Sequence, residues 1–215
     1  MQLPVHSSNI LFNLPFESKY DFTVSFTYRM NTNSTSPTAN DGFSVFFIDG
    51  RVQDLSGGGE GAGLGLISST DTTATSAVSG MFLAVGFDIT GEFFKSSGVP
   101  AFNTGTVTAQ PSSVGIRVTS DFAYISSVQT YDKNPYLFGP LGVDPTPYEY
   151  QTVRVGVRKN FGSVDVYSLN NETYIKLATF NTQLTTIPPI AKFGISYSGD
   201  TLFEVQNITL NYTSF

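Results

Sequence analysis

The sequence predicts an all-β fold, and three observations carry that prediction. Charged residues make up 13% of the 215 residues, well below the roughly 25% of an average soluble protein. Ser, Thr, Gly, Tyr and Phe are abundant instead, a mixture that suits strands and turns. Apolar and polar residues alternate along most of the chain, whereas no segment shows a comparably clear helical period. We expect one domain over residues 1–215, a common length for a single sandwich or barrel.

Strands that bury one face account for most of this alternation. In residues 22–30, FTVSFTYRM, every second residue is apolar and points one way, while the Thr, Ser and Arg residues between them point the other way. The same pattern recurs in residues 113–119, 152–158, 163–169, 173–180 and 191–198. In residues 202–212 the alternation slips by one position at Gln206 or Asn207, which predicts a β-bulge.

Two segments are apolar on both faces. They are DGFSVFFIDG, residues 41–50, and MFLAVGFDI, residues 81–89. Strands covered on both sides have this composition, so we expect both in the middle of a sheet. One face of the second segment is predicted to carry Phe82, Ala84, Gly86 and Asp88.

The predicted connections are polar or rich in Gly and Pro. The glycine run at residues 57–63 has neither the dinucleotide-binding nor the phosphate-loop spacing, and we interpret it as a tight loop before a buried strand at residues 64–67. The longest connection, residues 131–150, contains four prolines, which exclude a central strand. It is either a contact site for another protein or an ordered surface loop without a partner.

Composition excludes several classes of function. The formal net charge is −6 and basic residues are sparse, so we expect no nucleic acid partner. The chain has no cysteine, a single histidine, His6, and no Gly-x-Ser-x-Gly motif, so thiol chemistry and a Ser-His-Asp triad lack their residues. No apolar run approaches the ~20 residues of a membrane helix, and the first residues show no signal-peptide pattern. We therefore expect neither membrane insertion nor a secretion signal.

Four motifs resemble, in their order, those of the legume-type (L-type) lectin family. They are DGFSVFFIDG, GGGEGAGLGL, FLAVGFDITGEF and KFGISYSGDTLFEVQNITLNY. The resemblance runs from about Phe22 to the carboxyl terminus. It implies a concanavalin A-like antiparallel β-sandwich, or jelly roll, with the terminal strands adjacent in the flatter sheet. The Ser, Thr, Gly and Phe-rich composition also resembles that of lectin-like domains in structural proteins of phages and algal viruses.

The resemblance implies a carbohydrate-binding site. Asp41 matches the family aspartate whose carboxylate accepts hydrogen bonds from two hydroxyls of one hexose, although Asn-Asp-Gly is also a common turn. The other implied sugar contacts are an amide, further walls of the site and a stacking ring. The candidates are Gly59 or Gly61 for the amide, Ser198, Gly199 and Asp200 for the walls, and Tyr197 or Phe93 for the ring.

The metal site of the family is only partly present. Its central strand reads Glu-Phe-Asp, with both acids beside manganese and calcium, whereas this chain has Gly86, Phe87 and Asp88. The asparagine expected four residues after the aspartate is Glu92. The transition-metal ligand is therefore missing. Calcium, bound through Asp88, Glu92 and loop carbonyls, stays as the candidate cofactor.

Glycosidase chemistry lacks its nucleophile for the same reason. Related β-glucanases carry Glu, Asp and Glu on alternate positions of one strand and use two of them as a facing acid pair. Here the first of these positions is Gly86, and Glu92 lies past the strand. We expect no enzyme, and a glycan lyase or hydrolase with unfamiliar residues stays open as an alternative.

We expect a non-enzymatic carbohydrate-binding or adhesion module, displayed on a virion surface as a capsid decoration, tail or fibre protein for attachment to host-surface glycans. Its partners would be that polysaccharide and other virion proteins or further copies of the chain. The alternative location is extracellular. The alternative function is a purely structural virion protein with a degenerate lectin fold and no sugar binding.

Overall fold

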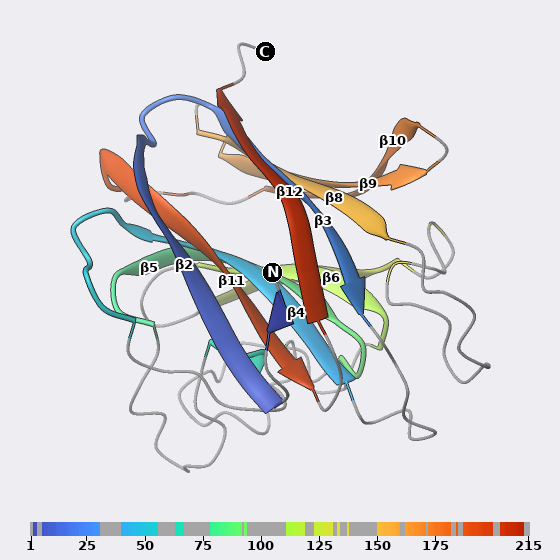
Figure 1. The fold of residues 1–215 in the computed structure, drawn as a ribbon. Coiled ribbons are helices and arrows are strands. Elements are labelled where there is room, and N and C mark those ends of the chain that lie inside the picture. Colours follow the sequence, from blue (N-terminus) through green and yellow to red (C-terminus); the bar gives the residue numbers. More distant parts are fainter. Residues whose placement is uncertain are drawn as a thin grey trace.

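The structure is a computed structural model, and the account below concerns the part of the chain that it describes. This part comprises residues 2–3, 6–30, 40–55, 63–66, 78–91, 93, 111–118, 123–130, 133, 137, 150–159, 162–170, 172–181, 184, 187–199 and 203–212. Figure 1 shows two layers of strands packed face to face, with β12, the last described strand, in the upper layer.

The strands of the described residues form two six-stranded antiparallel sheets. The β12 sheet has the order β1 (Gln2–Leu3), β12 (Phe203–Tyr212), β3 (Phe22–Met30), β8 (Gln151–Arg158), β9 (Ser163–Asn170) and β10 (Thr173–Asn181). The β4 sheet has the order β2 (His6–Glu17), β11 (Ile190–Gly199), β4 (Asn40–Asp49), β5 (Met81–Asp88), β6 (Ser113–Val118) and β7 (Ala123–Gln129). The all-β sandwich predicted from the sequence is confirmed, and the two terminal strands pair with each other, with Gln2 opposite Glu204.

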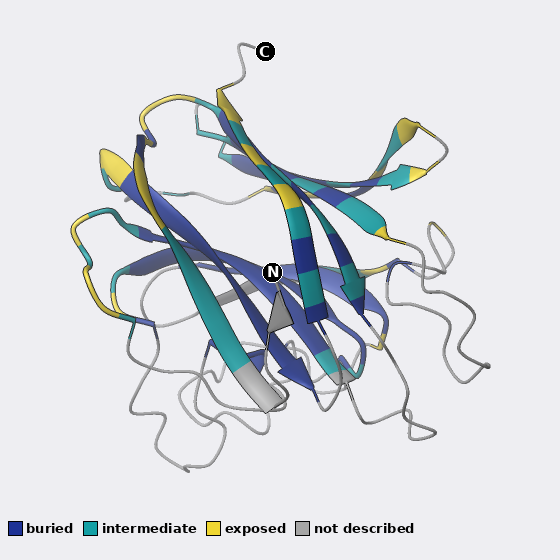
Figure 2. Cartoon of the chain, in the orientation of Figure 1, coloured by how far each residue is buried: buried dark blue, intermediate teal, exposed yellow. Residues whose placement is uncertain are grey.

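The core of the sandwich is built from the alternate residues that the sequence pattern assigns to one face of each strand. Phe, Tyr and Val side chains make up most of it, and the aromatic rings bury a large apolar area for each ordered residue. Phe43 and Phe87 stack with ring centroids 4.5 Å apart. Tyr197 of the β4 sheet stacks on Phe203 of the β12 sheet at 4.9 Å. In Figure 2 dark blue, the colour of buried residues, runs along strands of both sheets.

A second, smaller core covers the outer face of the β4 sheet. Its buried members come from two strands of the sheet, β4 and β5, and from the segments that follow them: Phe46, Ile48, Leu64, Leu66, Val78, Met81, Ala84 and Phe93. This cover corrects two of the sequence predictions. Strands β6 and β11 were expected to bury one face, but β6 is buried along its whole length and β11 from its second residue onward.

Other predictions about strands are confirmed or corrected. β4 and β5 lie in the middle of their sheet, as their apolar composition predicts. The bulge in β12 is present: its register shifts between Gln206 and Thr209, and Asn207 has a φ of 53°. The buried strand expected at residues 64–67 is wrong, because residues 64–66 form a buried turn. Phe82 belongs to the sandwich core rather than to the face of Ala84, because the pairing of β4 and β5 shifts beside it.

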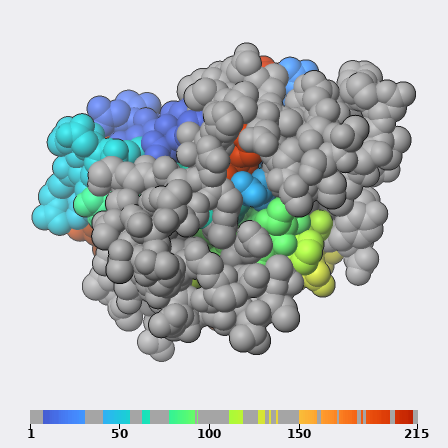
Figure 3. Space-filling view, turned by 90° about the horizontal axis from the view of Figure 1, so that it is seen from below, coloured from blue at the N-terminus to red at the C-terminus, as the bar shows by residue number. Residues whose placement is uncertain are grey.

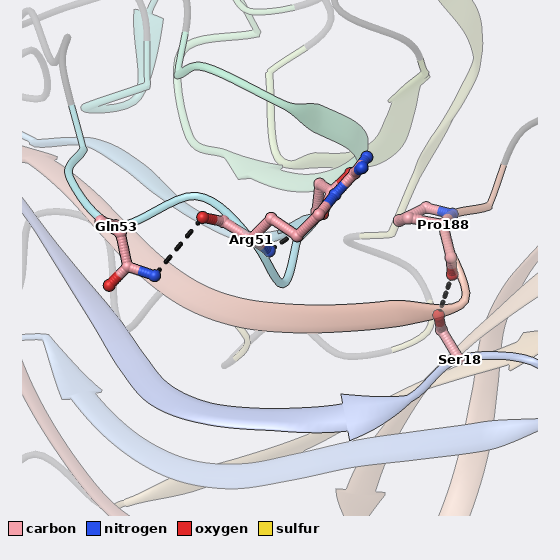
Figure 4. Close-up of polar contacts among 5 residues, drawn as sticks. Ser18, Arg51, Gln53 and Pro188 are labelled. Carbon is pink, nitrogen blue, oxygen red and sulfur yellow. Dashed lines mark hydrogen bonds and ion pairs between the residues drawn. The ribbon is translucent and has the colours of Figure 1, made fainter.

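The end of the β4 sheet at Asp49 and Ile190 is closed by short local contacts (Figure 4). The Gly50 amide donates to the carbonyl of Ile190 at 2.9 Å, and the Ser18 hydroxyl donates to the carbonyl of Pro188. The Gln53 side chain donates to the carbonyl of Arg51 at 3.4 Å. The predicted site residues Asp41, Asp88 and Ser198 lie at the opposite end of the sheet. None of the described segments forms a helix with the length and apolarity that crossing a membrane requires.

Candidate functional site

The site candidates meet where three adjacent strands of the β4 sheet start or end. β4 begins at Asn40, β5 ends at Asp88 and β11 ends at Gly199. The strands are antiparallel, so these points lie at one end of the sheet, and Gly42 pairs with both Asp88 and Ser198. Figure 3 views the molecule from below and shows small surface areas in the colours of β11, β4 and the region around β5 and β6 close together.

Asp41 is the extra residue of a bulge in β4. On the β11 side, Gly199 pairs with Asn40 and Ser198 with Gly42, so Asp41 has no opposite residue. Such a bulge redirects the side chain that it contains. Gly42 makes the bulge possible: its φ is 138°, and a Cβ there would lie 2.1 Å from the carbonyl oxygen of Phe87. The Asp-Gly step is therefore a structural device that aims a carboxylate at the end of the sheet.

The Asp41 carboxylate is held in place by its neighbours. The Ser198 hydroxyl donates to Asp41 Oδ2 at 2.6 Å, and the Ile89 amide donates to the Asp41 carbonyl at 2.8 Å. Two residues further into the sheet, where Ser44 pairs with Ser196, the hydroxyls of these two serines lie 2.6 Å apart. Asp41 itself is half-buried. The structure thus brings together two of the predicted site residues, Asp41 and Ser198, by a direct hydrogen bond.

The end of the glycine loop lies on the same part of the sheet. Leu64 and Gly65 both have positive φ, 47° and 75°, in the turn at residues 63–66. A Cβ on Gly65 would lie 2.7 Å from the Tyr197 carbonyl oxygen and 3.1 Å from that of Ser8, so the turn packs directly on β11 and β2. This places the turn at residues 63–66 beside Tyr197, the residue that precedes Ser198. Gly59, Gly61, Glu92 and Asp200 lie outside the described residues.

Asp88 is a buried carboxylate whose partners are the backbone amides that follow it. Its Oδ1 accepts from the Gly91 amide at 2.7 Å and from the Thr90 hydroxyl at 3.2 Å, and its Oδ2 accepts from the Phe93 amide at 2.6 Å. Burial raises the pKa of Asp88 to about 7; the amides and the hydroxyl oppose this rise, and the nearby Asp41 carboxylate adds to it. The chain therefore wraps around Asp88 as it leaves β5.

Neither ring proposed for sugar stacking is accessible. Tyr197 is 0% exposed and belongs to the sandwich core, and Phe93 is 1% exposed and belongs to the second core. The pattern of alternation placed Tyr197 on the inner face, and only its position beside Ser198 suggested a ligand contact. In these buried positions neither ring can stack on a sugar.

Arg117 is a residue of this region that the sequence did not single out. It lies in β6, is 1% exposed, and donates from Nε at 2.9 Å and from a terminal nitrogen at 2.5 Å to the carbonyl of Phe93. Its guanidinium carbon also lies 5.2 Å from the Phe93 ring centroid. An arginine on the outward side of a strand ordinarily indicates a solvent-exposed position. Nothing in the sequence therefore predicted that Arg117 is buried.

The comparisons with known proteins agree with this geometry. The lectin from Bauhinia forficata in complex with GalNAc superposes with a TM-score of 0.65 at 20% identity, over 98% of this chain and 82% of that one. The fold is that of the legume lectins. The winged bean acidic lectin complexed with methyl-α-D-galactose gives a TM-score of 0.63 at 14% identity, over 97% and 80% of the two chains. The metal-free form of lectin I-B4 from Griffonia simplicifolia gives 0.62 at 17%, over 97% and 82%.

No protein-family model matches the sequence, and a search of curated proteins likewise finds no match. At identities of 14–20% the solved structures show the fold alone. The site therefore has to be argued from the residues of this chain.

The manganese and calcium site that the lectin fold implies does not fit the residues present. A Cβ on Gly86, where the family has its glutamate, would lie 2.7 Å from two carbons of the Phe93 ring. Both oxygens of Asp88 already accept hydrogen bonds from the chain. Within the described residues, no three His, Cys, Asp or Glu side chains come together in an arrangement that could hold a metal ion.

Proposed function

We propose that this protein is a non-enzymatic carbohydrate-binding module and that a sugar binds at the end of the β4 sheet, beside Asp41. The observation that carries the proposal is the Asp41 bulge: a half-buried carboxylate, redirected by Gly42 and held by Ser198, at one end of a lectin-fold sheet. Structural neighbours described with bound GalNAc and methyl-α-D-galactose support it, since they share the fold.

The chemistry of the site suits hydroxyl recognition. A carboxylate accepts hydrogen bonds from adjacent sugar hydroxyls, and charge-assisted bonds of this kind are stronger than those between neutral groups. The hydrogen bond from Ser198 fixes the orientation of Asp41 before a ligand arrives, which lowers the entropic cost of binding. In this proposal Gly59 or Gly61 supplies an amide donor, and Gly199 and Asp200 supply part of the wall.

The two acids at the site do not suit hydrolysis. A retaining glycosidase needs two accessible carboxyl groups about 5 to 5.5 Å apart on either side of the scissile bond. Asp88 is 0% exposed, and its oxygens accept from Gly91, Thr90 and Phe93. We therefore propose recognition without catalysis.

A glycan array tests the proposed function. Wild-type protein should bind at least one glycan class, and Asp41→Asn should weaken that binding about tenfold or more, because a neutral amide replaces a charged acceptor. Asp165→Asn, on the outer face of the other sheet, is the matched control and should bind like the wild type. Absence of binding to every glycan class, or equal binding by Asp41→Asn, would refute the proposal.

We also propose that the module is displayed on a virion, where it would attach to host-surface glycans and contact other virion proteins or further copies of itself. The support is the compositional resemblance to lectin-like domains of viral structural proteins. The connection at residues 131–150, the predicted contact segment, lies mostly outside the described residues. Mass spectrometry of purified particles tests this proposal, which fails if the protein is absent from them.

A further inference from the structure

We propose that the chain itself supplies the groups that shape the end of the β4 sheet, so that the site is formed without a divalent cation. The lock, as we call it, consists of the Asp88 carboxylate, the Phe93 ring and the Arg117 guanidinium. Its existence does not depend on sugar binding, whereas its consequence, cation-independent glycan recognition, rests on the function proposed above.

The first part of the lock is the way Asp88 uses its oxygens. The amides of Gly91 and Phe93 point at the two oxygens from 2.7 and 2.6 Å. Amide hydrogens carry partial positive charge, so they give the carboxylate the electrostatic partner that a cation would otherwise supply. Calcium requires six to eight oxygen ligands, and the described residues contain no cluster of acids that could provide them. The carboxylate therefore organises the chain directly.

The second part is the Phe93 ring above Gly86. A Cβ at position 86 would lie 2.7 Å from two ring carbons and 3.3 Å from Leu64 Cδ1. The ring is 1% exposed and packs in the second core. An apolar group thus fills the space in which an acidic ligand would have to stand, and the absence of a side chain at Gly86 is what makes room for it.

The third part is Arg117, which holds Phe93 from the neighbouring strand. Its two hydrogen bonds to the Phe93 carbonyl, at 2.9 and 2.5 Å, fix the residue that carries both the ring and an amide donor to Asp88. The positive charge of the Arg117 guanidinium, which is bound to the Phe93 carbonyl, also disfavours a metal cation nearby. The three parts meet at Phe93: its amide binds Asp88, its ring covers Gly86 and its carbonyl binds Arg117.

The test uses metal ions alone, so that it is independent of any glycan. Protein treated with EDTA is compared with protein in millimolar calcium chloride or manganese chloride, by thermal unfolding and by titration calorimetry. The expected result is no heat of binding and an unchanged Tm. A rise in Tm of about 5 °C or more, which a metal at one hundred times its Kd would produce in a chain of this size, would overturn the proposal.

Amide hydrogen exchange provides the second readout. In EDTA, the Gly91 and Phe93 amides should exchange slowly in the wild type and at least tenfold faster in Arg117→Met. Arg154→Met is the matched control, because Arg154 lies over the Tyr174 ring on the other sheet at 3.6 Å, and it should leave both amides protected. Fast exchange of the wild-type amides in EDTA, with protection restored by calcium, would contradict the lock.

The outcomes separate the two proposals. If metal ions have no effect in either test and no glycan binds, the lock is supported and the proposed function is refuted. Glycan binding that disappears in EDTA and returns with calcium removes the lock and keeps the proposed function.

Discussion

The outer faces of the two sheets differ in the groups that bind their buried carboxylates. On the β4 sheet, Asp88 is 0% exposed and is held by backbone amides, one of them from Phe93 of the second core. On the β12 sheet, Asp165 is 2% exposed yet has the cationic groups of Lys176 and Arg158 at 3.0 Å, and both partners reach solvent. The β12 face also pairs Arg29 with Glu204 at 2.6 Å. The buried acid of the β4 sheet is therefore bound mainly by backbone amides, and that of the β12 sheet by cationic side chains.

This difference indicates where a specific site can form. Groups fixed by backbone contacts under an apolar cover keep one arrangement, because moving them exposes buried amides. Long side chains in partly exposed ion pairs adjust at little cost. The covered face therefore has the rigidity that ligand recognition needs, and the open face has the adaptability of an ordinary surface.

The largest expected effect comes from a methyl group added to a glycine on each sheet. Gly42→Ala forces a Cβ to within 2.1 Å of the Phe87 carbonyl oxygen at a φ of 138°, and we expect a loss of about 4 kcal/mol or more in the free energy of unfolding. Gly156→Ala places its Cβ 3.5 Å from Thr23 Cγ2, an ordinary contact, and should change stability by less than about 0.5 kcal/mol. Urea unfolding of both variants measures the difference. Similar losses of unfolding free energy in the two variants would mean that the two sheets tolerate an added methyl group equally well.

A smaller effect is expected from removing the two buried acids. Asp88→Ala leaves the amides of Gly91 and Phe93 without an acceptor inside the protein, and we expect a loss of about 2–3 kcal/mol. Asp165→Ala releases Lys176 and Arg158 to water, so the loss should be about 1 kcal/mol. Thermal and chemical unfolding of the two variants give the comparison. An Asp165→Ala variant less stable than Asp88→Ala would reverse the order we derive.

The smallest expected effect is a dependence on pH at Asp165. Burial acts to raise the pKa of Asp165, but Thr179, Lys176 and Arg158 outweigh it and hold the pKa below its ordinary value. The folded state therefore binds the proton less tightly than the unfolded state, and the contribution to stability is present above about pH 4 and is lost as the pH falls below it. The stability difference between wild type and Asp165→Asn should shrink from about 1 kcal/mol near pH 6 toward zero near pH 2. A difference that stays constant over this range would exclude the ion pairs as its cause.

The sequence predicted much of the fold because its information is local. Period-two alternation located the strands, and the doubly apolar composition of β4 and β5 placed them in mid-sheet. The convergence of Asp41 and Ser198 followed from strand ends in a sheet of known topology, and the structure adds the hydrogen bond between them. The lectin resemblance supplied the topology that the pattern alone lacked.

The remaining features depend on contacts between distant segments. Arg117 alternates with apolar residues and gives the pattern of an exposed side chain, because its partner is the carbonyl of Phe93, 24 residues away. The burial of both faces of β11 comes from a turn at residues 63–66 that packs on the backbone of Tyr197 and Ser8. Phe93 is buried for a similar reason. Its ring packs over Gly86, which has no side chain, and this contact is not visible in the local sequence pattern.

The central claim is that the end of the β4 sheet, beside Asp41, binds the sugar and that the outer face of the β12 sheet does not. NMR amide chemical shifts, recorded while the glycan selected by the array is added, test this most directly. We predict shifts confined to residues around Asp41 and Gly42, Ile89 to Gly91, and Ser198 and Gly199, with none around Arg154 and Tyr167. Shifts clustered on the β12 face, or none at either face, would contradict the claim.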